Sequence, residues 1–91
     1  MIKYFLYFPN PFNAITNIHF QLLQDSYVQL SIYDLKGNHI KTLLDSPQVR
    51  GYKTLTWNGK NENGELIPAG VYFYSVSSGN ITDSRKIIYL K

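Results

Sequence analysis

The residues that could carry out chemistry are few in this chain of 91 residues, which has two histidines, six acidic residues and no cysteine. Without cysteine, a disulfide framework, a Cys-based zinc site and a cysteine nucleophile are all excluded. His19 and His39 are candidate metal ligands, but each falls on the polar side of an alternating segment. The chain contains no G-x-S-x-G, P-loop or H-E-x-x-H motif. We therefore expect no enzymatic activity, no metal and no cofactor.

The acidic residues fall where turns are expected. The four aspartates are typical of hairpin ends and have no histidine or serine partner at an interpretable spacing: Asp25, Asp34, Asp45 and Asp83. Residues 58–65, NGKNENGE, superficially resemble a calcium loop, which needs carboxylates at alternate positions and a bidentate acid at its end. The three asparagines of this segment are neutral, which leaves only Glu62 and Glu65. Turn chemistry is favoured, with weak calcium binding as the alternative.

Aromatic side chains offer a second kind of site. Tyr72 and Tyr74 share one face of a predicted strand and Phe73 lies on the other. Together with Trp57, these rings could form a platform on which a carbohydrate stacks. The alternative is that Trp57, Tyr72 and Tyr74 fill the core, and we favour burial of the single tryptophan because it is the largest source of apolar area.

Overall composition restricts the classes of partner. The net charge is +3, the nine basic residues are scattered, and no apolar run is long enough for a membrane span. Nucleic-acid binding would need basic residues clustered beside the aromatic ones, and they are not clustered. Hydrophobic residues make up 44% of the chain, which suffices for one core in a single small domain.

The elements that position these residues are strands, because apolar residues alternate with polar ones nearly throughout. Ile18, Phe20 and Leu22 alternate with polar neighbours, and so do Val28 and Leu30. The predicted strands cover residues 17–22, 28–33, 39–44, 53–57, 71–77 and 84–90. Short strands between turn signals indicate an all-β, immunoglobulin-like antiparallel β-sandwich of about seven strands.

Two turns can be assigned to specific residues. Asp34 can accept a hydrogen bond from an amide two residues ahead, and Gly37 can adopt positive φ, as in a type I turn with a bulge. Residues 57–70 form the longest irregular segment, in which Gly64 supplies a turn. Gly70 permits a bend before the next strand begins.

The segment YFPNPFNAITNIHF opens the domain with a stiff, extended approach. Pro9 and Pro11 cannot donate ladder hydrogen bonds and restrict the residues before them, while Asn10 can satisfy nearby backbone groups. Phe12 then has a fixed place from which to enter the core. We expect residues 1–7 to be a lead-in or an artificial remnant, and residues 8–91 to form one domain. The apolar opening is too short for a signal peptide and lacks a small-residue cleavage site.

These motifs carry a resemblance to a known family. FPNPFNAITNIHF resembles the YPNPFNP-x-T-x-I-x-F opening of the C-terminal sorting domains of the type IX (Por) secretion system, and of the related immunoglobulin-like domain of the flagellar hook-capping protein. The resemblance continues through VQLSIYDLKGNHIKTL, TWNGKNENGELIPAGVYFYSV and SRKIIYLK, in the same order and spacing. Ala14 and Asn58 depart from a frequent proline and a frequent aspartate, but both positions keep turn-compatible residues.

The resemblance implies a secretion signal, read by outer-membrane export machinery, at the C-terminus of a larger bacterial cargo protein that reaches the cell surface or is released. The domain itself would do no chemistry, and its partners would be the export machinery and the N-terminal cargo, with no nucleic acid and no small-molecule substrate. Our candidate recognition strip is the ending: Arg85, Lys86, Ile87, Ile88, Tyr89, Leu90 and Lys91. It could be read by strand addition, or its basic residues could only protect an edge from aggregation. The alternatives are a carbohydrate- or surface-binding module of a secreted enzyme and a structural assembly module like the hook-capping domain.

Overall fold

The computed structural model of the chain describes residues 2–5 and 16–89. The predictions made for Pro9, Asn10, Pro11, Phe12, Leu90 and Lys91 lie outside these residues. Within them the chain forms strands joined by turns, with no helix. The strands are β1 (Ile2–Phe5), β2 (Thr16–Leu22), β3 (Ser26–Asp34), β4 (His39–Gln48), β5 (Gly51–Trp57), β6 (Gly70–Ser78) and β7 (Ile81–Tyr89).

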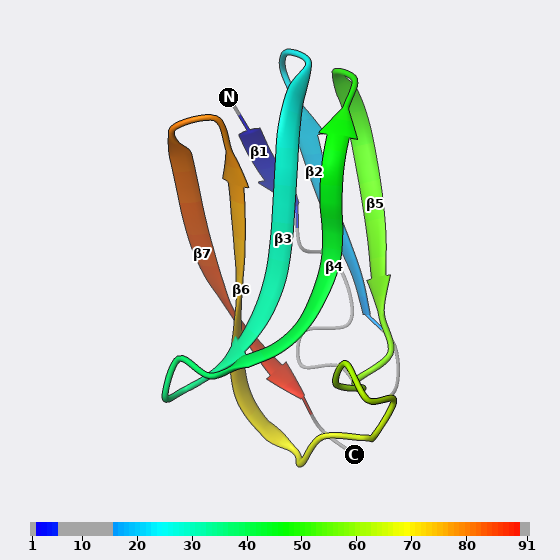
Figure 1. The fold of residues 1–91 in the computed structure, drawn as a ribbon, viewed down its shortest axis with the longest axis vertical. Coiled ribbons are helices and arrows are strands. Elements are labelled where there is room, and N and C mark those ends of the chain that lie inside the picture. Colours follow the sequence, from blue (N-terminus) through cyan, green and yellow to red (C-terminus); the bar gives the residue numbers. More distant parts are fainter. Residues whose placement is uncertain (1, 6–15, 90–91) are drawn as a thin grey trace.

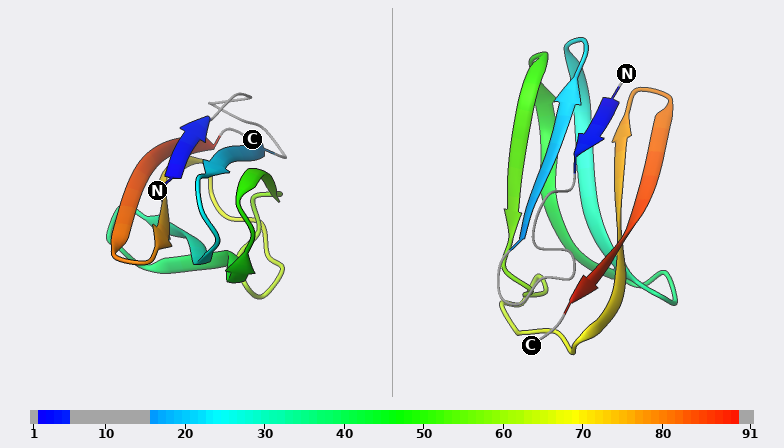
Figure 2. Two further views of the ribbon diagram at one scale, coloured as in Figure 1. Left: turned by 90° about the horizontal axis from the view of Figure 1, so that it is seen from above. Right: turned by 180° about the vertical axis from the view of Figure 1, so that it is seen from behind.

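Two antiparallel sheets face each other (Figures 1 and 2). One has the order β1-β2-β5 and the other the order β4-β3-β6-β7. The predicted all-β antiparallel sandwich is confirmed. The alternating pattern predicted six of the strands, and β1 is an addition. Its residues 2–5 pair with β2, so part of the segment expected to be a lead-in belongs to the three-stranded sheet.

The core lies between the sheets and is built from every second residue of the strands. The inward side chains of β2, β3 and β6 are almost fully buried: Ile18, Phe20, Leu22, Val28, Leu30, Ile32, Tyr72, Tyr74 and Val76. Burying a large apolar side chain stabilises a fold by roughly 1.5–3 kcal/mol. A one-residue slip of any of these strands would turn its whole apolar set towards water, so this pattern fixes the register.

Strand β4 departs from simple alternation. Leu30 pairs with Leu44 and Ser31 with Thr42, so Leu43 is an extra residue, and a second shift follows before Tyr33. Such bulges let consecutive residues turn towards the same face. Leu43 and Leu44 both pack against the core for this reason. The strand continues to Gln48, four residues beyond its predicted end.

Candidate functional site

The β3–β4 turn has the geometry that the sequence predicts. One carboxylate oxygen of Asp34, Oδ1, accepts hydrogen bonds from the amides of Lys36 at 2.9 Å and Asn38 at 2.8 Å. These bonds, led by the one from Asn38, hold the pKa of Asp34 below its usual value. Gly37 has φ +85°, which a β-carbon would strain. Asp34 is therefore a structural acid whose hydrogen-bonding capacity is used within the turn.

An aromatic cluster closes one end of the sandwich. Trp57 is 1% exposed and its Nε1 donates to the carbonyl of Lys60 at 3.0 Å. The ring centroid of Trp57 lies 6.0 Å from that of Tyr72 and 6.2 Å from that of Tyr89. Gly59 lies directly under Tyr89, since a β-carbon there would be 3.0 Å from the ring. The predicted burial of Trp57 is confirmed.

Burial of this cluster corrects one alternative. The proposed stacking platform needs Trp57, Tyr72 and Tyr74 at the surface, and all three lie in the core. Tyr72 donates its hydroxyl to the carbonyl of Pro68 at 2.6 Å, and burial raises its pKa. Alternation explains the outcome, because only one face of β6 can point outward, and that face carries Phe73.

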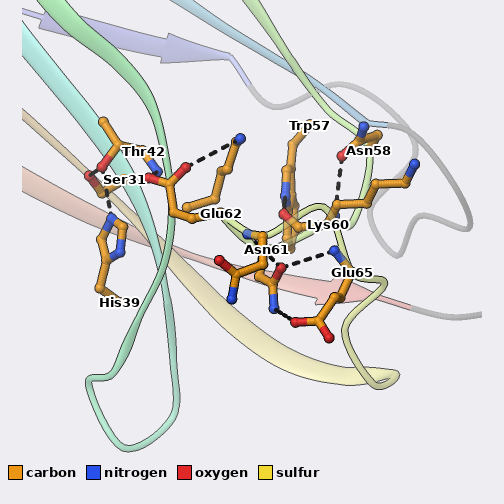
Figure 3. A network of polar contacts seen from close by, with 11 residues as sticks. Ser31, His39, Thr42, Trp57, Asn58, Lys60, Asn61, Glu62 and Glu65 are labelled. Carbon is orange, nitrogen blue, oxygen red and sulfur yellow. Dashed lines mark hydrogen bonds and ion pairs between the residues drawn. The ribbon is translucent and has the colours of Figure 1, made fainter.

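The segment between β5 and β6 is held against the edge of β4 (Figure 3). Glu62 donates its amide to the carbonyl of Ile40 at 3.0 Å, and its Oε2 accepts the amide of Thr42 at 3.2 Å. Its Oε1 lies 3.3 Å from Nζ of Lys41. The backbone hydrogen bond from Thr42, followed by Lys41, lowers the pKa of Glu62. Glu62 thus hydrogen-bonds to the edge of β4 as a residue of an added strand would. Local residue patterns in the sequence do not indicate this long-range contact.

Asn61 organises the same segment. Its Oδ1 accepts the amides of Asn63 and Glu65, each at 3.0 Å, and its Nδ2 donates to Glu65 Oε1 at 3.1 Å. Gly64 completes the turn at φ +82°. The Glu62 carboxylate therefore contacts β4, whereas the Glu65 carboxylate accepts a hydrogen bond from Asn61 within the same segment. These contacts stabilise the turn, as the sequence predicts.

The two histidines lie on different sheets. His19 in β2 has Nδ1 3.1 Å from Thr54 Oγ1, and His39 in β4 has Nε2 2.7 Å from Thr42 Oγ1. Each is thus placed beside a threonine, and the two do not converge on a common site. Within the described residues, no group of three or more histidine, aspartate or glutamate side chains is placed to hold a metal ion.

The described part of the candidate recognition strip, residues 85–89, does not form one surface. Ile87 is fully buried and Tyr89 is 2% exposed, so both are core residues. Arg85 pairs with Tyr74 on the inward side of β7, while Lys86 pairs with Phe73 on the outer side. Both basic side chains are exposed, because β7 is the last strand of its sheet. Arg85 and Lys86, the basic groups in the described part of the strip, therefore lie on opposite faces of one edge strand.

The edge strands β4, β5 and β7 carry features that oppose pairing with another chain. On β7, Asp83 and Arg85 occupy inward positions and lie 3.8 Å apart. On β5, Lys53 pairs with buried Phe20 and so also takes an inward position. Strand β4 has Pro47 and the bulge at Leu43. Inward charges, proline and bulges are the usual means by which edges avoid strand addition.

The geometry can be compared with known proteins. A family profile described as the FlgD Ig-like domain matches residues 12–81. This chain belongs to the FlgD Ig-like domain family. The match extends from Phe12, directly after the two prolines of the opening, to the first residue of β7, so the Ig-like fold seen here is that of the family. No protein of curated function matches the chain.

Solved structures share the fold at low sequence identity. Dimeric latent PorU from Porphyromonas gingivalis matches with TM-score 0.74 and 22% identity over 99% of this chain and 9% of the PorU chain. FlgD from P. aeruginosa matches with TM-score 0.64 and 20% identity over 84% of this chain and 66% of its own. FlgD from Xanthomonas campestris matches with TM-score 0.63 and 17% identity over 96% of this chain and 64% of its own. In each of these proteins the matched region is one part of a longer chain.

Among the described residues, the structure contains no helix long and apolar enough to cross a membrane.

Proposed function

We propose that this FlgD Ig-like domain is a sorting module of the type IX secretion system, which directs an attached cargo protein through the outer membrane to the cell surface or the medium. The observation that carries the proposal is the match to PorU, which takes in 99% of this chain but only 9% of PorU. A small sandwich that corresponds to one section of a much larger chain fits a module appended to cargo. The four motifs that resemble type IX sorting domains support the same assignment.

In this proposal the domain is recognised and does no catalysis. Arg85 and Lys86 are the groups that the export machinery contacts, because both are exposed on an edge strand. Ile87 and Tyr89 contribute indirectly by fixing β7 to the core. Recognition through side chains is favoured over strand addition, since Asp83 and Arg85 occupy inward positions on the same edge.

The second candidate is a structural assembly module. The family profile is that of FlgD, and two FlgD structures share the fold, one of them described in the context of hook capping in flagellar assembly. Such a module would bind a neighbouring subunit and would have no effect on the export of a fused protein.

Export of a fused reporter separates the two candidates. A periplasm-targeted fluorescent protein carrying residues 1–91 at its C-terminus is expressed in a bacterium with a type IX system and in the same strain lacking that system. Sorting predicts reporter on the surface or in the medium of the first strain only. Retention of a folded fusion in the periplasm of both strains would reject sorting and leave the assembly module.

A further inference from the structure

The outer face of the sheet β4-β3-β6-β7 carries side chains in straight rows, one residue from each strand. Tyr33 pairs with both His39 and Phe73, and Phe73 pairs with Lys86. We call these four residues, three with rings and Lys86 at the edge, the ring row. With neighbouring strands about 4.8 Å apart, the row spans roughly 14 Å across the sheet.

A second row of hydroxyl groups lies beside the ring row. It consists of Thr42, Ser31, Ser75 and Ser84, which pair across the same four strands. Ser31 is covered by its neighbours, whereas Ser84 is exposed. Thr42 Oγ1 lies 2.7 Å from His39 Nε2 and 3.0 Å from Ser31 Oγ, so its hydroxyl is already oriented. We call these four residues the hydroxyl row.

The rings of the ring row are only partly covered. Tyr33 and Phe73 point away from the core and remain partly exposed, unlike Tyr72 and Tyr74 of the same sheet. His39 meets Tyr33 edge to face, with ring centroids 5.7 Å apart. Partly exposed rings in register on two adjacent strands offer flat apolar area at a fixed spacing.

A hollow lies next to the ring row, at the end of the sheet where β3 ends and β6 begins. It has a volume of about 330 Å³ and lies between residues 34–38 and residues 69–72, with Val71 in its wall. Val71 is two residues before Phe73 and therefore shares its face of β6. The volume lies at the lower end of the range of small-molecule sites.

Charge restricts what can bind here. On the two central strands the outer positions carry aromatic, serine, glutamine and valine side chains and no charge: Tyr27, Gln29, Ser31, Tyr33, Val71, Phe73, Ser75 and Ser77. In the three rows nearest the hollow, charge is confined to Lys86 on one edge and Asp45 on the other. The hollow itself adds one charge of each sign, Asp34 and Lys36, so neither sign predominates and the face is complementary to an uncharged molecule.

We infer that the outer face of the four-stranded sheet binds a neutral oligosaccharide. The apolar face of a sugar ring packs on Tyr33 and Phe73, and its hydroxyl groups exchange hydrogen bonds with Ser75, Ser84 and Thr42. This places the carbohydrate on the face opposite to the buried aromatic cluster. Lys86, at the edge of this face, also belongs to the sorting proposal, but the contacts with the sugar are assigned to other residues, so the inference does not depend on that proposal.

The test uses the isolated ¹⁵N-labelled chain and four probes: cellohexaose, xylohexaose, mannohexaose and maltohexaose at millimolar concentrations. Amide chemical shifts are expected to move in the ring row and hydroxyl row on titration with at least one probe. Phe73→Leu keeps an apolar residue but removes the ring, and Ser75→Arg fills the hydroxyl row from an outward position. Each is expected to weaken binding at least tenfold.

The matched control is Tyr52→Ala, which removes a ring that is 77% exposed on the other sheet. It is expected to leave the affinity unchanged, with folding of all variants checked by circular dichroism. If Phe73→Leu fails to fold, the affinity of Ser75→Arg for the probe decides the test. Absence of shifts with all four probes, shifts confined to the other sheet, or self-association through this face in sedimentation would each overturn the inference. Export of the reporter fusion is measured separately, so each proposal can fail without the other.

Discussion

At the scale of single residues, two glycines with similar backbone angles differ in what surrounds them. Gly59 has φ +76° and Gly64 has φ +82°, but only Gly59 lies against a side chain, the ring of Tyr89. Gly64→Ala should lower the free energy of unfolding by about 1–2 kcal/mol, the cost of a left-handed conformation. Gly59→Ala should cost about 1–3 kcal/mol more, because the buried ring must shift. Urea denaturation of both variants measures the difference, and equal losses would show that the contact with Tyr89 is unimportant.

Tyr74 should make stability depend on pH in the alkaline range. Burial raises the pKa of Tyr74 from 10.0 to about 12. The folded chain therefore holds the phenol proton more tightly than the unfolded chain, so this stabilisation is complete below pH 10 and is lost as the pH rises to 12. The loss amounts to about 2–3 kcal/mol at the upper end. Tyr74→Phe should show a flatter profile than the parent chain in urea denaturation between pH 10 and 12, and identical slopes would contradict the assignment.

At the scale of elements, the contact between Glu62 and β4 fastens the longest irregular segment to the opposite sheet. Glu62→Ala removes the side-chain acceptor for the Thr42 amide and the partner of Lys41, so the Thr42 amide should exchange with solvent faster than in the parent chain. Glu65→Ala is the matched control, because that carboxylate accepts from Asn61 within its own segment. Amide exchange followed by NMR measures both. Unchanged protection of Thr42 in Glu62→Ala would show that the segment is held by other contacts.

The same contact should weaken in acid. The pKa of Glu62 is lowered by folding from its usual 4.5, so its contribution is present above that value and is lost as the pH falls through the lower, folded-state value. The protection factor of Thr42, corrected for intrinsic exchange, should fall below pH 4.5 in the parent chain but not in Glu62→Ala. Parallel profiles in the two proteins would contradict this.

Predictability from sequence also differs between elements. Alternation predicted six strands, and the Asp34–Gly37 turn followed from local residue types, because both patterns depend on neighbours in the sequence. The bulges of β4 and the docking of Glu62 could not be predicted, since they arise from packing between distant segments. The candidate strip was read as continuous, but Arg85 and Lys86 take opposite faces of β7, a consequence of the two-residue period of a strand.

At the scale of the whole molecule, the fold explains why deletion is a poor test of recognition. Removing Ile87–Lys91 would take Ile87 and Tyr89 out of the core, so loss of export could reflect unfolding alone. Substitution of the exposed basic residues leaves the core intact. The packed core then holds β7 in place, with Arg85 and Lys86 exposed on its two faces.

The central claim is that the export machinery recognises Arg85 and Lys86 on a folded domain. The most direct test compares the surface-exposed fraction of the reporter fusion carrying Arg85→Ser and Lys86→Ser with that of a fusion carrying Lys36→Ser and Arg50→Ser. The second pair removes the same charge from exposed turn positions. The account predicts at least a tenfold loss of surface reporter for the first pair and near-parental export for the second, with both domains folded. Equal export of the two fusions would contradict it.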